Sequence, residues 1–294
     1  MPELPEVEIV RRRLATCLPG LVVGRVVVTD AKVSDLTEAQ LRDRLEGRRV
    51  LGLRRRGKHL IVDLGGAAGD AADSSGEVET VAVIHLRMTG QLLFRPLPGS
   101  RPARFIWFLE PDTELHFQDV RRFGRLAAFG PAHESEFFAA LGPEPFGDEF
   151  DVAYLRAALA GRRAPLKSFL LDQRRIAGVG NIYADEALFR ARLHPLRAAG
   201  SVGPREAARH RTALLETLQA GIDHEGSSIE SFVDPAGERG AFQEILNVYQ
   251  RTGEPCRVCT TPVSRVVVGG RGTHFCPRCQ RRRSGKMSPV RRRP

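Results

Sequence analysis

The stretch CRVCTTPVSRVVVGGRGTHFCPRC, residues 256–279, carries four cysteines in two C-x2-C pairs that are sixteen residues apart. Thiolates at this spacing are typical of a zinc site whose four positions are all filled by protein, so the metal is structural. Between the pairs, two apolar runs flank Gly269 and Gly270 and predict a hairpin with Arg271 at its tip. We therefore expect one structural Zn²⁺, with these ligands: Cys256, Cys259, Cys276 and Cys279.

The region before the cysteines has a helical pattern. Ala- and Leu-rich segments separated by turn signals predict helices at 151–160, 165–171, 180–190 and 204–221. The glycine-rich turn before residue 181 would present backbone N–H groups to a phosphate, although a tightly packed helix–turn–helix connection is the simpler interpretation. Residues 226–244 are polar and contain glycine, which predicts a mobile loop.

The first 130 residues are rich in β-like runs. Val, Leu, Ile and Phe gather in short segments punctuated by Gly, Pro and Asp, at 21–28, 50–53, 60–64, 81–86, 91–94, 105–109, 115–117 and 125–129. Helices are expected at 5–18 and 37–46, and a surface loop at 65–79. The pattern predicts an α+β multidomain chain whose N-terminal part is a sandwich or barrel with flanking helices.

Breaker residues divide the chain. Gly130-Pro131 and the stretch 141–145, LGPEP, indicate a linker. The expected domains are an N-terminal domain at 1–130, a linker at 131–150, a helical domain at 151–245, a zinc-ribbon hairpin at 246–282 and a basic tail at 283–294.

The charge balance narrows the class of partner. Among 294 residues, 45 are Lys or Arg and 35 are Asp or Glu, which gives a net charge of +10. Such an excess favours nucleic acid first and an anionic membrane second, although a basic protein without a polyanionic partner is the plain alternative. No run approaches the ~18 apolar residues of a membrane helix, and the N-terminus is acidic and broken by proline, unlike a secretory signal. We expect a cytoplasmic protein without a membrane partner.

The first residues can carry covalent chemistry. Aminopeptidases remove methionine before a small residue, and Pro2 would then offer a secondary amine. Such an amine can attack an aldehydic sugar carbon and form an iminium that stays positively charged at any pH. Glu3 and Glu6 are close enough in sequence to move protons, although carboxylates near a helix start also suit the helix dipole.

A second candidate lies in a turn between β-like runs. Residues 118–124, QDVRRFG, combine arginine, phenylalanine and glycine, and Met88 occupies another turn. Proteins that kink DNA insert apolar side chains between base steps in this way. Ordinary core packing of Phe123 and Met88 is the alternative.

Taken together, several motifs resemble the formamidopyrimidine-DNA glycosylase family of bacterial repair enzymes. They are PELPEVE at 2–8, RRGKHL at 55–60, DVRRFG at 119–124, GVGNIYADE at 178–186 and the terminal cysteine cluster, in the order typical of that family. The resemblance spans the chain. It implies an N-terminal β-sandwich with flanking helices, a helix–two-turn–helix domain and a zinc-ribbon hairpin. The resemblance also implies a monomeric protein that acts as a DNA glycosylase and AP lyase and removes oxidised purines from damaged duplex DNA.

The resemblance also implies catalytic roles. Pro2 corresponds to the Schiff-base nucleophile, Glu3 to the general acid and Glu6 to a supporting carboxylate. Lys58 corresponds to the proton donor in β-elimination. Arg271 corresponds to the hairpin arginine that grips phosphate and assists δ-elimination.

Further residues are implied to contact DNA. Phosphate contacts would come from Arg162, Lys167 and Asn181, and the gap left by the flipped base would be filled by Met88, Arg121 and Phe123. Residues 226–244 would form a lid over the damaged base. The histidine that family members often have near position 102 is missing; Arg101 and Arg104 are candidate substitutes. Cys17 faces a predicted helix core and is expected to be inert.

Three other interpretations remain. An endonuclease VIII-like glycosylase for oxidised pyrimidines shares most of these features, although PELPEVE favours the purine branch. A catalytically silent DNA-binding protein would have lost Pro2 or Glu3, and both are present. An RNA-binding zinc-ribbon protein accounts for the charge and the cysteines but not for the N-terminus.

Overall fold

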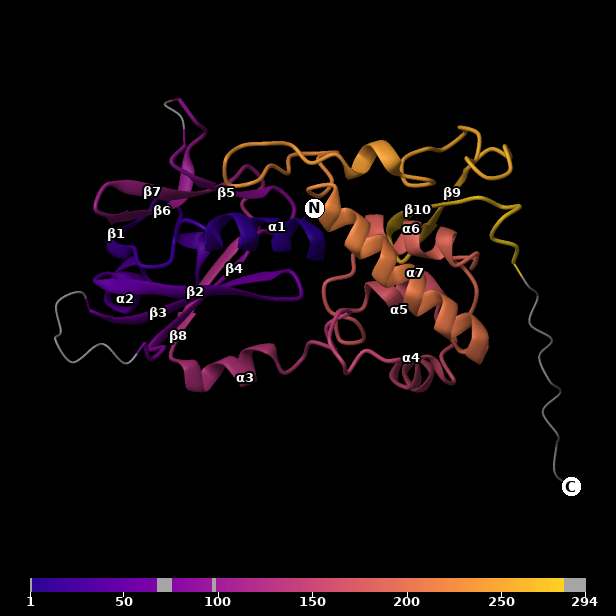
Figure 1. Ribbon diagram of the computed structural model, residues 1–294, viewed down its shortest axis with the longest axis horizontal. Coiled ribbons are helices and arrows are strands. Elements are labelled where there is room, and N and C mark those ends of the chain that lie inside the picture. Colours follow the sequence, from indigo (N-terminus) through magenta and orange to yellow (C-terminus); the bar gives the residue numbers. More distant parts are fainter. Residues whose placement is uncertain (1, 68–75, 97–98, 283–294) are drawn as a thin grey trace, which may run out of the picture. The chain divides into compact units, whose positions relative to one another are not determined.

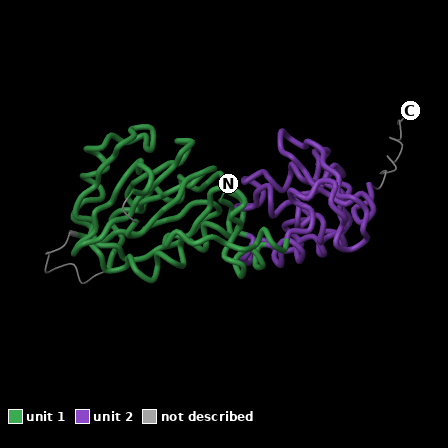
Figure 2. Tube along the Cα trace, turned by 90° about the horizontal axis from the view of Figure 1, so that it is seen from above, with its two compact units in different colours: residues 1–144, 218–245 green, residues 145–217, 246–294 purple. Residues whose placement is uncertain are grey.

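The computed structural model describes residues 2–67, 76–96 and 99–282. The chain forms two compact units: unit 1 is residues 1–144 and 218–245, and unit 2 is residues 145–217 and 246–294 (Figure 2). The sequence pattern places residues 218–245 in the helical domain, whereas in the structure these residues are part of unit 1. Most of the predicted 65–79 loop and the tail from 283 lie outside the described residues. Within the described ranges, no helix is long and apolar enough to span a membrane.

Unit 1 is built on one antiparallel sheet of eight strands in the order β5-β7-β6-β1-β2-β3-β4-β8 (Figure 1). The strands are β1 Val22–Val28, β2 Arg48–Arg56, β3 His59–Ala67, β4 Thr80–His85, β5 Gly90–Phe94, β6 Ala103–Glu110, β7 Thr113–Asp119 and β8 Arg125–Phe129. All eight contribute buried side chains to a single core. Each strand coincides with one of the β-like runs predicted from the sequence.

Strand β4 shows how the two faces of the sheet are used. Side chains alternate along a strand, so one face of β4 carries Ala82 and Ile84 and the other Val81 and Val83. The first pair joins the main core. The second pair packs in a smaller cluster with Phe138 of helix α3, Glu134–Phe138. Both faces of β4 are therefore covered, which explains its continuous apolar run.

Two further helices complete unit 1. Helix α1, Leu4–Ala15, packs on β2 and β3, and α2, Glu38–Leu45, packs on β1, β4 and β8. The buried face of α1 carries Val7, Val10 and Leu14 at helical spacing, as the sequence predicts. Packing α1 on β2 and β3 brings the first residues of the chain close to the sheet that carries Lys58.

Unit 2 is helical with one small hairpin. Its elements are α4 Val152–Leu159, α5 Leu166–Leu171, α6 Asn181–Arg190, most of α7 Pro204–Asp223, β9 Ser264–Val268 and β10 Arg271–Phe275. Helix α6 is buried along most of its length and packs against α5 and β10. The Glu186 carboxylate accepts the backbone N–H groups of residues 247–249 at 2.8–2.9 Å. This carboxylate fixes the chain that leads into the cysteine region.

Candidate functional site

The start of α1 brings Pro2 together with two buried carboxylates. Pro2 is buried, and the Glu3 and Glu6 side chains are each 1% exposed. One oxygen of Glu6 accepts the backbone N–H of Glu3 at 2.8 Å, which satisfies a free donor at the helix start. The other oxygen accepts the backbone N–H of Ser227 at 2.9 Å. Glu6 thus ties the predicted nucleophile to the beginning of the predicted lid.

Gly226 makes that contact possible. Its φ of +77° lies in the left-handed region, and an added Cβ would lie 2.9 Å from the Phe232 ring and 3.1 Å from Cγ of Glu6. Any other residue would strain the backbone and displace Glu6. The Ser227 Oγ is buried and has no hydrogen-bond partner in the part of the chain that the structure describes.

Lys58 lies in a two-residue turn between β2 and β3. Gly57 has a φ of +58° and Lys58 does not have a positive φ, as a type II′ turn requires. Lys58 is only 7% exposed. The glycine therefore allows the tight turn that presents Lys58, and the eight-stranded sheet fixes its position.

Glu144 holds this turn from outside the hairpin. Its carboxylate accepts the backbone N–H of Gly57, and it pairs with Arg55 at 2.7 Å and Arg56 at 3.1 Å. Arg55 also pairs with Glu8 of α1 at 3.2 Å. The helix carrying the N-terminus and the turn carrying Lys58 thus share one ion-pair network. Sequence reasoning missed Glu144, because it lies in a segment that the pattern marks only as a linker.

Two histidines pack beside the same turn. The rings of His59 and His85 are edge to face with centroids 4.5 Å apart. Burial lowers the pKa of His59 to about 4, and nearby cationic side chains act in the same direction. Burial also lowers the pKa of His85. Both rings are neutral near pH 7, so neither adds a positive charge beside Lys58.

The predicted DNA wedge is exposed but firmly held. Phe123 is 50% exposed, and the Arg121 guanidinium lies 5.0 Å from its ring centroid. The Asp119 carboxylate accepts the Gly124 N–H at 2.6 Å and the Thr89 hydroxyl, while Thr89 Oγ1 accepts the Arg121 N–H at 3.1 Å. Thr89 follows Met88 directly, so these bonds join the two turns that the sequence singled out.

The two arginines proposed as substitutes for the missing histidine have different surroundings. Arg104 is 3% exposed and pairs with Asp30 at 2.9 Å and Asp119 at 3.4 Å, which is a structural position. Arg101 is exposed and lines a cavity of about 240 Å³ with Thr89 and Gln118. The Gln118 amide nitrogen is buried and has no hydrogen-bond partner among the described residues. Arg101 is therefore the better placed of the two.

In unit 2, two of the three predicted phosphate contacts, Lys167 and Asn181, lie against the hairpin. Lys167 is 0% exposed; its ammonium pairs with Asp185 at 2.6 Å and donates to the Gly272 carbonyl at 3.1 Å. The Asn181 amide donates to the same carbonyl at 3.2 Å. Arg162, after α4, is exposed. Lys167 thus fixes β10 through the Gly272 carbonyl, a structural role that the sequence pattern did not suggest.

Arg271 itself lies at the exposed start of β10. The turn before it, Gly269–Gly270, has positive φ at both positions, as a type I′ turn requires. Farther along β10, the His274 N–H donates to Asp185 at 2.9 Å. Asp185 therefore binds both Lys167 and the hairpin, and it orients the strand that carries Arg271.

The four cysteines converge as a zinc site requires. All four sulfur atoms lie within 4.8 Å of one another, with Cys256–Cys279 at 3.9 Å and Cys259–Cys276 at 3.4 Å. A zinc ion with Zn–S bonds of ~2.3 Å in tetrahedral geometry needs sulfurs about 3.8 Å apart. The donor set fits one structural zinc and leaves no position for a substrate. Cys17 is only partly buried and lies apart from this cluster.

Family models match almost the whole chain. The formamidopyrimidine-DNA glycosylase N-terminal domain matches residues 1–126, the H2TH domain of the same enzymes matches 141–233, and a zinc finger found in FPG and IleRS matches 253–282. A formamidopyrimidine-DNA glycosylase of Heliobacterium modesticaldum is 43% identical over 96% of this chain and 100% of its own length. The chain belongs to the formamidopyrimidine-DNA glycosylase family.

Solved structures of this family agree with the fold. MutM (Fpg) of Thermus thermophilus is 43% identical, with a TM-score of 0.83 over 96% of this chain and 99% of its own. A Lactococcus lactis FPG variant, crystallised with a Fapy-dG containing DNA, is 33% identical, with a TM-score of 0.86 over 96% of this chain and all of its own. The α+β architecture, the family and the zinc site predicted from the sequence are thereby confirmed.

Proposed function

We propose that this protein is a base-excision repair DNA glycosylase and AP lyase that acts on oxidised purines in duplex DNA. One observation carries the proposal: Pro2 directly precedes the start of helix α1, where two buried carboxylates, Glu3 and Glu6, meet. Buried carboxylates beside an amine are suited to proton transfer at a reacting sugar. Family membership supports the same activity, since full-length relatives bear the name formamidopyrimidine-DNA glycosylase.

The proposed chemistry begins with the amine. After removal of Met1, the Pro2 nitrogen attacks C1′ of the damaged nucleotide, and the bond from C1′ to the base breaks as Glu3 delivers a proton. Glu3 then takes the proton that the nitrogen loses and passes it to the ring oxygen O4′ as the C1′–O4′ bond breaks, which leaves a positively charged iminium. Glu6 keeps Glu3 and the lid segment in register through its two backbone contacts.

The iminium then drives strand cleavage. It acidifies the C2′ hydrogen, and loss of that proton expels the 3′ phosphate in β-elimination. A second elimination expels the 5′ phosphate and leaves a one-nucleotide gap. Lys58 is the proposed proton donor for the first step, and Arg271 grips phosphate during the second. The zinc ion holds the hairpin and takes no part in these steps.

DNA binding would use both units. The net charge of +10 suits a phosphate backbone, which is bound without reading sequence. Arg162 and Asn181 are proposed phosphate contacts, with Lys167 supporting them through the Gly272 carbonyl. Lactococcus lactis relatives have been crystallised with Fapy-dG and abasic-site DNA. Because the chemistry needs no second copy and no membrane, we propose a monomer that works on DNA in the cytoplasm.

The flipped nucleotide leaves a gap that the wedge would fill. Enzymes that act on a base inside a duplex extrude it, at a cost of a few kcal/mol. Met88, Arg121 and Phe123 would occupy the space, with Arg121 facing the orphaned base. Their turns are cross-linked by Thr89 and Asp119, so insertion would not require a loop to order first.

A second substrate class has its own support. A wild-type Lactococcus lactis relative was crystallised with an oxidized pyrimidine containing DNA. The endonuclease VIII-like alternative therefore differs in which oxidised base is the preferred substrate. The proposed chemistry is the same. Residues 226–244, which would cover the damaged base, are where that preference is expected to be set.

Borohydride trapping tests the proposal. The protein is incubated with a duplex containing 8-oxoguanine opposite cytosine and, separately, with one containing an oxidised pyrimidine. We expect a covalent complex that forms faster with 8-oxoguanine, and base release that is lost in Glu3→Gln. Binding of both duplexes without trapping of either would support the silent DNA-binding alternative instead.

A further inference from the structure

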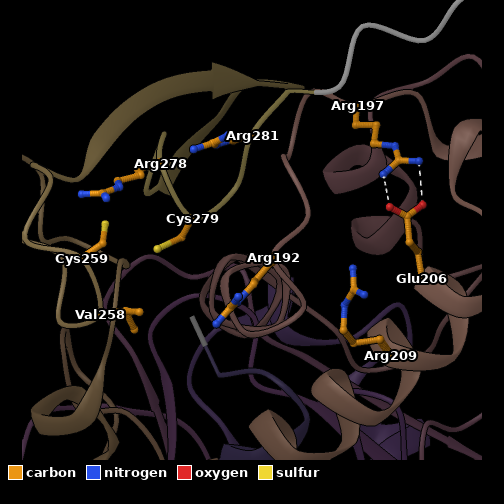
Figure 3. A pocket seen from close by; sticks show the side chains of 9 residues that line it. All are labelled: Arg192, Arg197, Glu206, Arg209, Val258, Cys259, Arg278, Cys279 and Arg281. Carbon is orange, nitrogen blue, oxygen red and sulfur yellow. Dashed lines mark hydrogen bonds and ion pairs between the residues drawn. The ribbon is translucent and has the colours of Figure 1, made fainter.

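A basic pocket of about 660 Å³ lies beyond the C-terminal end of α6 in unit 2 (Figure 3). Its lining includes five arginines, Arg192, Arg197, Arg209, Arg278 and Arg281, and two of the zinc-binding cysteines. Helix α6 has 10 residues, and at ~1.5 Å per residue its two ends are about 15 Å apart. The pocket is therefore distinct from the Asn181 cluster at the start of that helix.

The pocket carries an excess of positive charge. Glu206 is the one carboxylate in the lining, and it pairs with Arg197. A zinc ion bound by four thiolates has a formal charge of about −2, which further offsets the arginines. A positive excess of about +2 remains after both are included. Residues 281–294 contain no Asp or Glu that could neutralise it.

Part of the lining is already fixed in place. Arg197 donates to Glu206 at 2.7 Å and to the Ser201 hydroxyl at 2.8 Å. Arg209 donates to the Ala191 carbonyl at 2.9 Å. Fixed donors lose less entropy when a ligand binds. Arg278 and Arg281 form no ion pair with any residue in the described ranges, so their charges remain available.

Arg192 stands at a backbone position that favours glycine. The Arg192 N–H donates to the Phe189 carbonyl and the Leu193 N–H to the Leu188 carbonyl, both at 2.9 Å, which is the Schellman ending of a helix. The φ of Arg192 is +53°, a conformation that a Cβ disfavours. Figure 3 shows its side chain in the middle of the pocket, between the cysteines and Arg209. This side chain is exposed and forms no ion pair with a described residue, so its charge is also available.

We propose that this pocket binds phosphate, as a second anion site separate from the residues proposed above to contact DNA. The arginines come from the end of α6, from α7 and from the zinc region, so their donors approach from several directions. A phosphate group offers three acceptor oxygens arranged around one centre, whereas a carboxylate offers two in one plane. The ligand is either a free oligophosphate, such as the triphosphate of a nucleotide, or the backbone of a second DNA strand.

Calorimetry with inorganic triphosphate tests the site. The protein is first saturated with a duplex containing a stable abasic-site analogue, so that the proposed catalytic and DNA-contacting residues are occupied. We expect one triphosphate site that persists in this complex and weakens by about tenfold or more in Arg192→Gly. The same variant should be at least as thermally stable as wild type, because glycine relieves the strained φ. Arg190→Ala removes an equal charge two residues away, outside the pocket, and should bind like wild type.

Further arms identify the ligand and can overturn the proposal. Displacement of triphosphate by a short undamaged single strand would assign the site to a DNA backbone, and failure to displace it would assign a free oligophosphate. Equal binding by Arg192→Gly and wild type, or loss of the site once the duplex is bound, would contradict a second phosphate site. Hexaglutamate binding as tightly as triphosphate would contradict the preference for phosphate. A protein that binds triphosphate but does not bind the duplex would contradict the proposed repair function and leave the pocket intact.

Discussion

Two hairpins deliver the two basic residues proposed for strand cleavage, and they are stabilised in different ways. Lys58 lies in the turn of β2 and β3, within a sheet of eight strands and above a large core. Arg271 follows the turn of β9 and β10, which form a sheet of two strands. A hairpin of two strands is at best marginally stable alone. Around Lys58, the hydrophobic core stabilises the hairpin. Around β10, that stability comes from the zinc site, Asp185 and Lys167.

This difference indicates which structural change would displace each of the two residues. The position of Lys58 depends on many apolar contacts and on Glu144, so loss of one contact should shift it without unfolding unit 1. The position of Arg271 depends on fewer supports: a metal, one buried ion pair and the packing of β10 on α6. Loss of the metal or of the ion pair should loosen the whole hairpin.

Zinc removal should have the largest effect. Cys276→Ser takes away one of four thiolates, and structural zinc contributes roughly 10 kcal/mol or more to small domains of this kind. We expect the variant to lose zinc, measured with a metal-binding dye, and to lose DNA binding. Cys17→Ser, outside the cluster, should keep both. A Cys276→Ser protein with its full zinc content and normal DNA affinity would show that the hairpin needs no metal.

Breaking the buried ion pair should come next. Lys167→Met leaves Asp185 charged and without its ammonium, which typically costs about 3–5 kcal/mol. Urea unfolding should show this loss, and hydrogen exchange should show that β10 opens before α6. Arg190→Ala breaks the exposed pair with Glu216 and should cost less than about 1 kcal/mol. Equal losses of unfolding free energy in Lys167→Met and Arg190→Ala would contradict the claim that a buried ion pair holds the β9–β10 hairpin.

Glu144→Ala should affect chemistry rather than stability. It frees the Gly57 N–H and two arginines, so Lys58 loses its fixed position. Small misplacements of a catalytic group can cost about 10²-fold in rate, and we expect roughly a tenfold or larger loss in β-elimination.

The control for that variant is a carboxylate that pairs with the same strand, β2. Glu134→Ala breaks a pair with Arg54 of β2 at 2.7 Å but does not touch the turn, so its elimination rate should match wild type. Single-turnover strand cleavage on a preformed abasic site measures both variants. Borohydride trapping should be unchanged in each, because Pro2 is not involved. Equal cleavage by Glu144→Ala and wild type would exclude a positioning role for Glu144.

The turn glycines should give the smallest effect and sharpen the comparison. Gly57→Ala and Gly270→Ala each place a Cβ at positive φ, which costs about 1 kcal/mol. In the large sheet this should lower the melting temperature only slightly. In the small hairpin the same strain should also speed the release of zinc to a chelator. Gly52→Ala, with a β conformation and open space around it, should do neither.

Much of the fold was predictable from local patterns. The eight strands, six of the helices and the zinc ligands were all marked by periodicity, by turn residues or by cysteine spacing. Helix α3 was not, because its five residues are too few to establish a helical period and follow a breaker at Gly130-Pro131. Its last residue, Phe138, packs on a sheet face that only the folded topology creates.

The catalytic residues were predictable only as candidates. Pro2, Glu3 and Lys58 stood out through chemistry and resemblance, and their roles in catalysis remain predictions. Their supports did not stand out, since Glu144 is 87 residues from Gly57 in sequence and no local pattern joins them. Lys167 shows the converse: the resemblance implied a phosphate contact, whereas tertiary packing buries Lys167 against Asp185.

The most direct test of the account is to locate the trapped sugar on the chain. The borohydride-reduced complex is digested with trypsin and the modified peptide is sequenced by mass spectrometry. We expect modification at the nitrogen of Pro2, in the peptide of residues 2–11, with Met1 absent. Modification at Lys58, or at any other side chain, would contradict it.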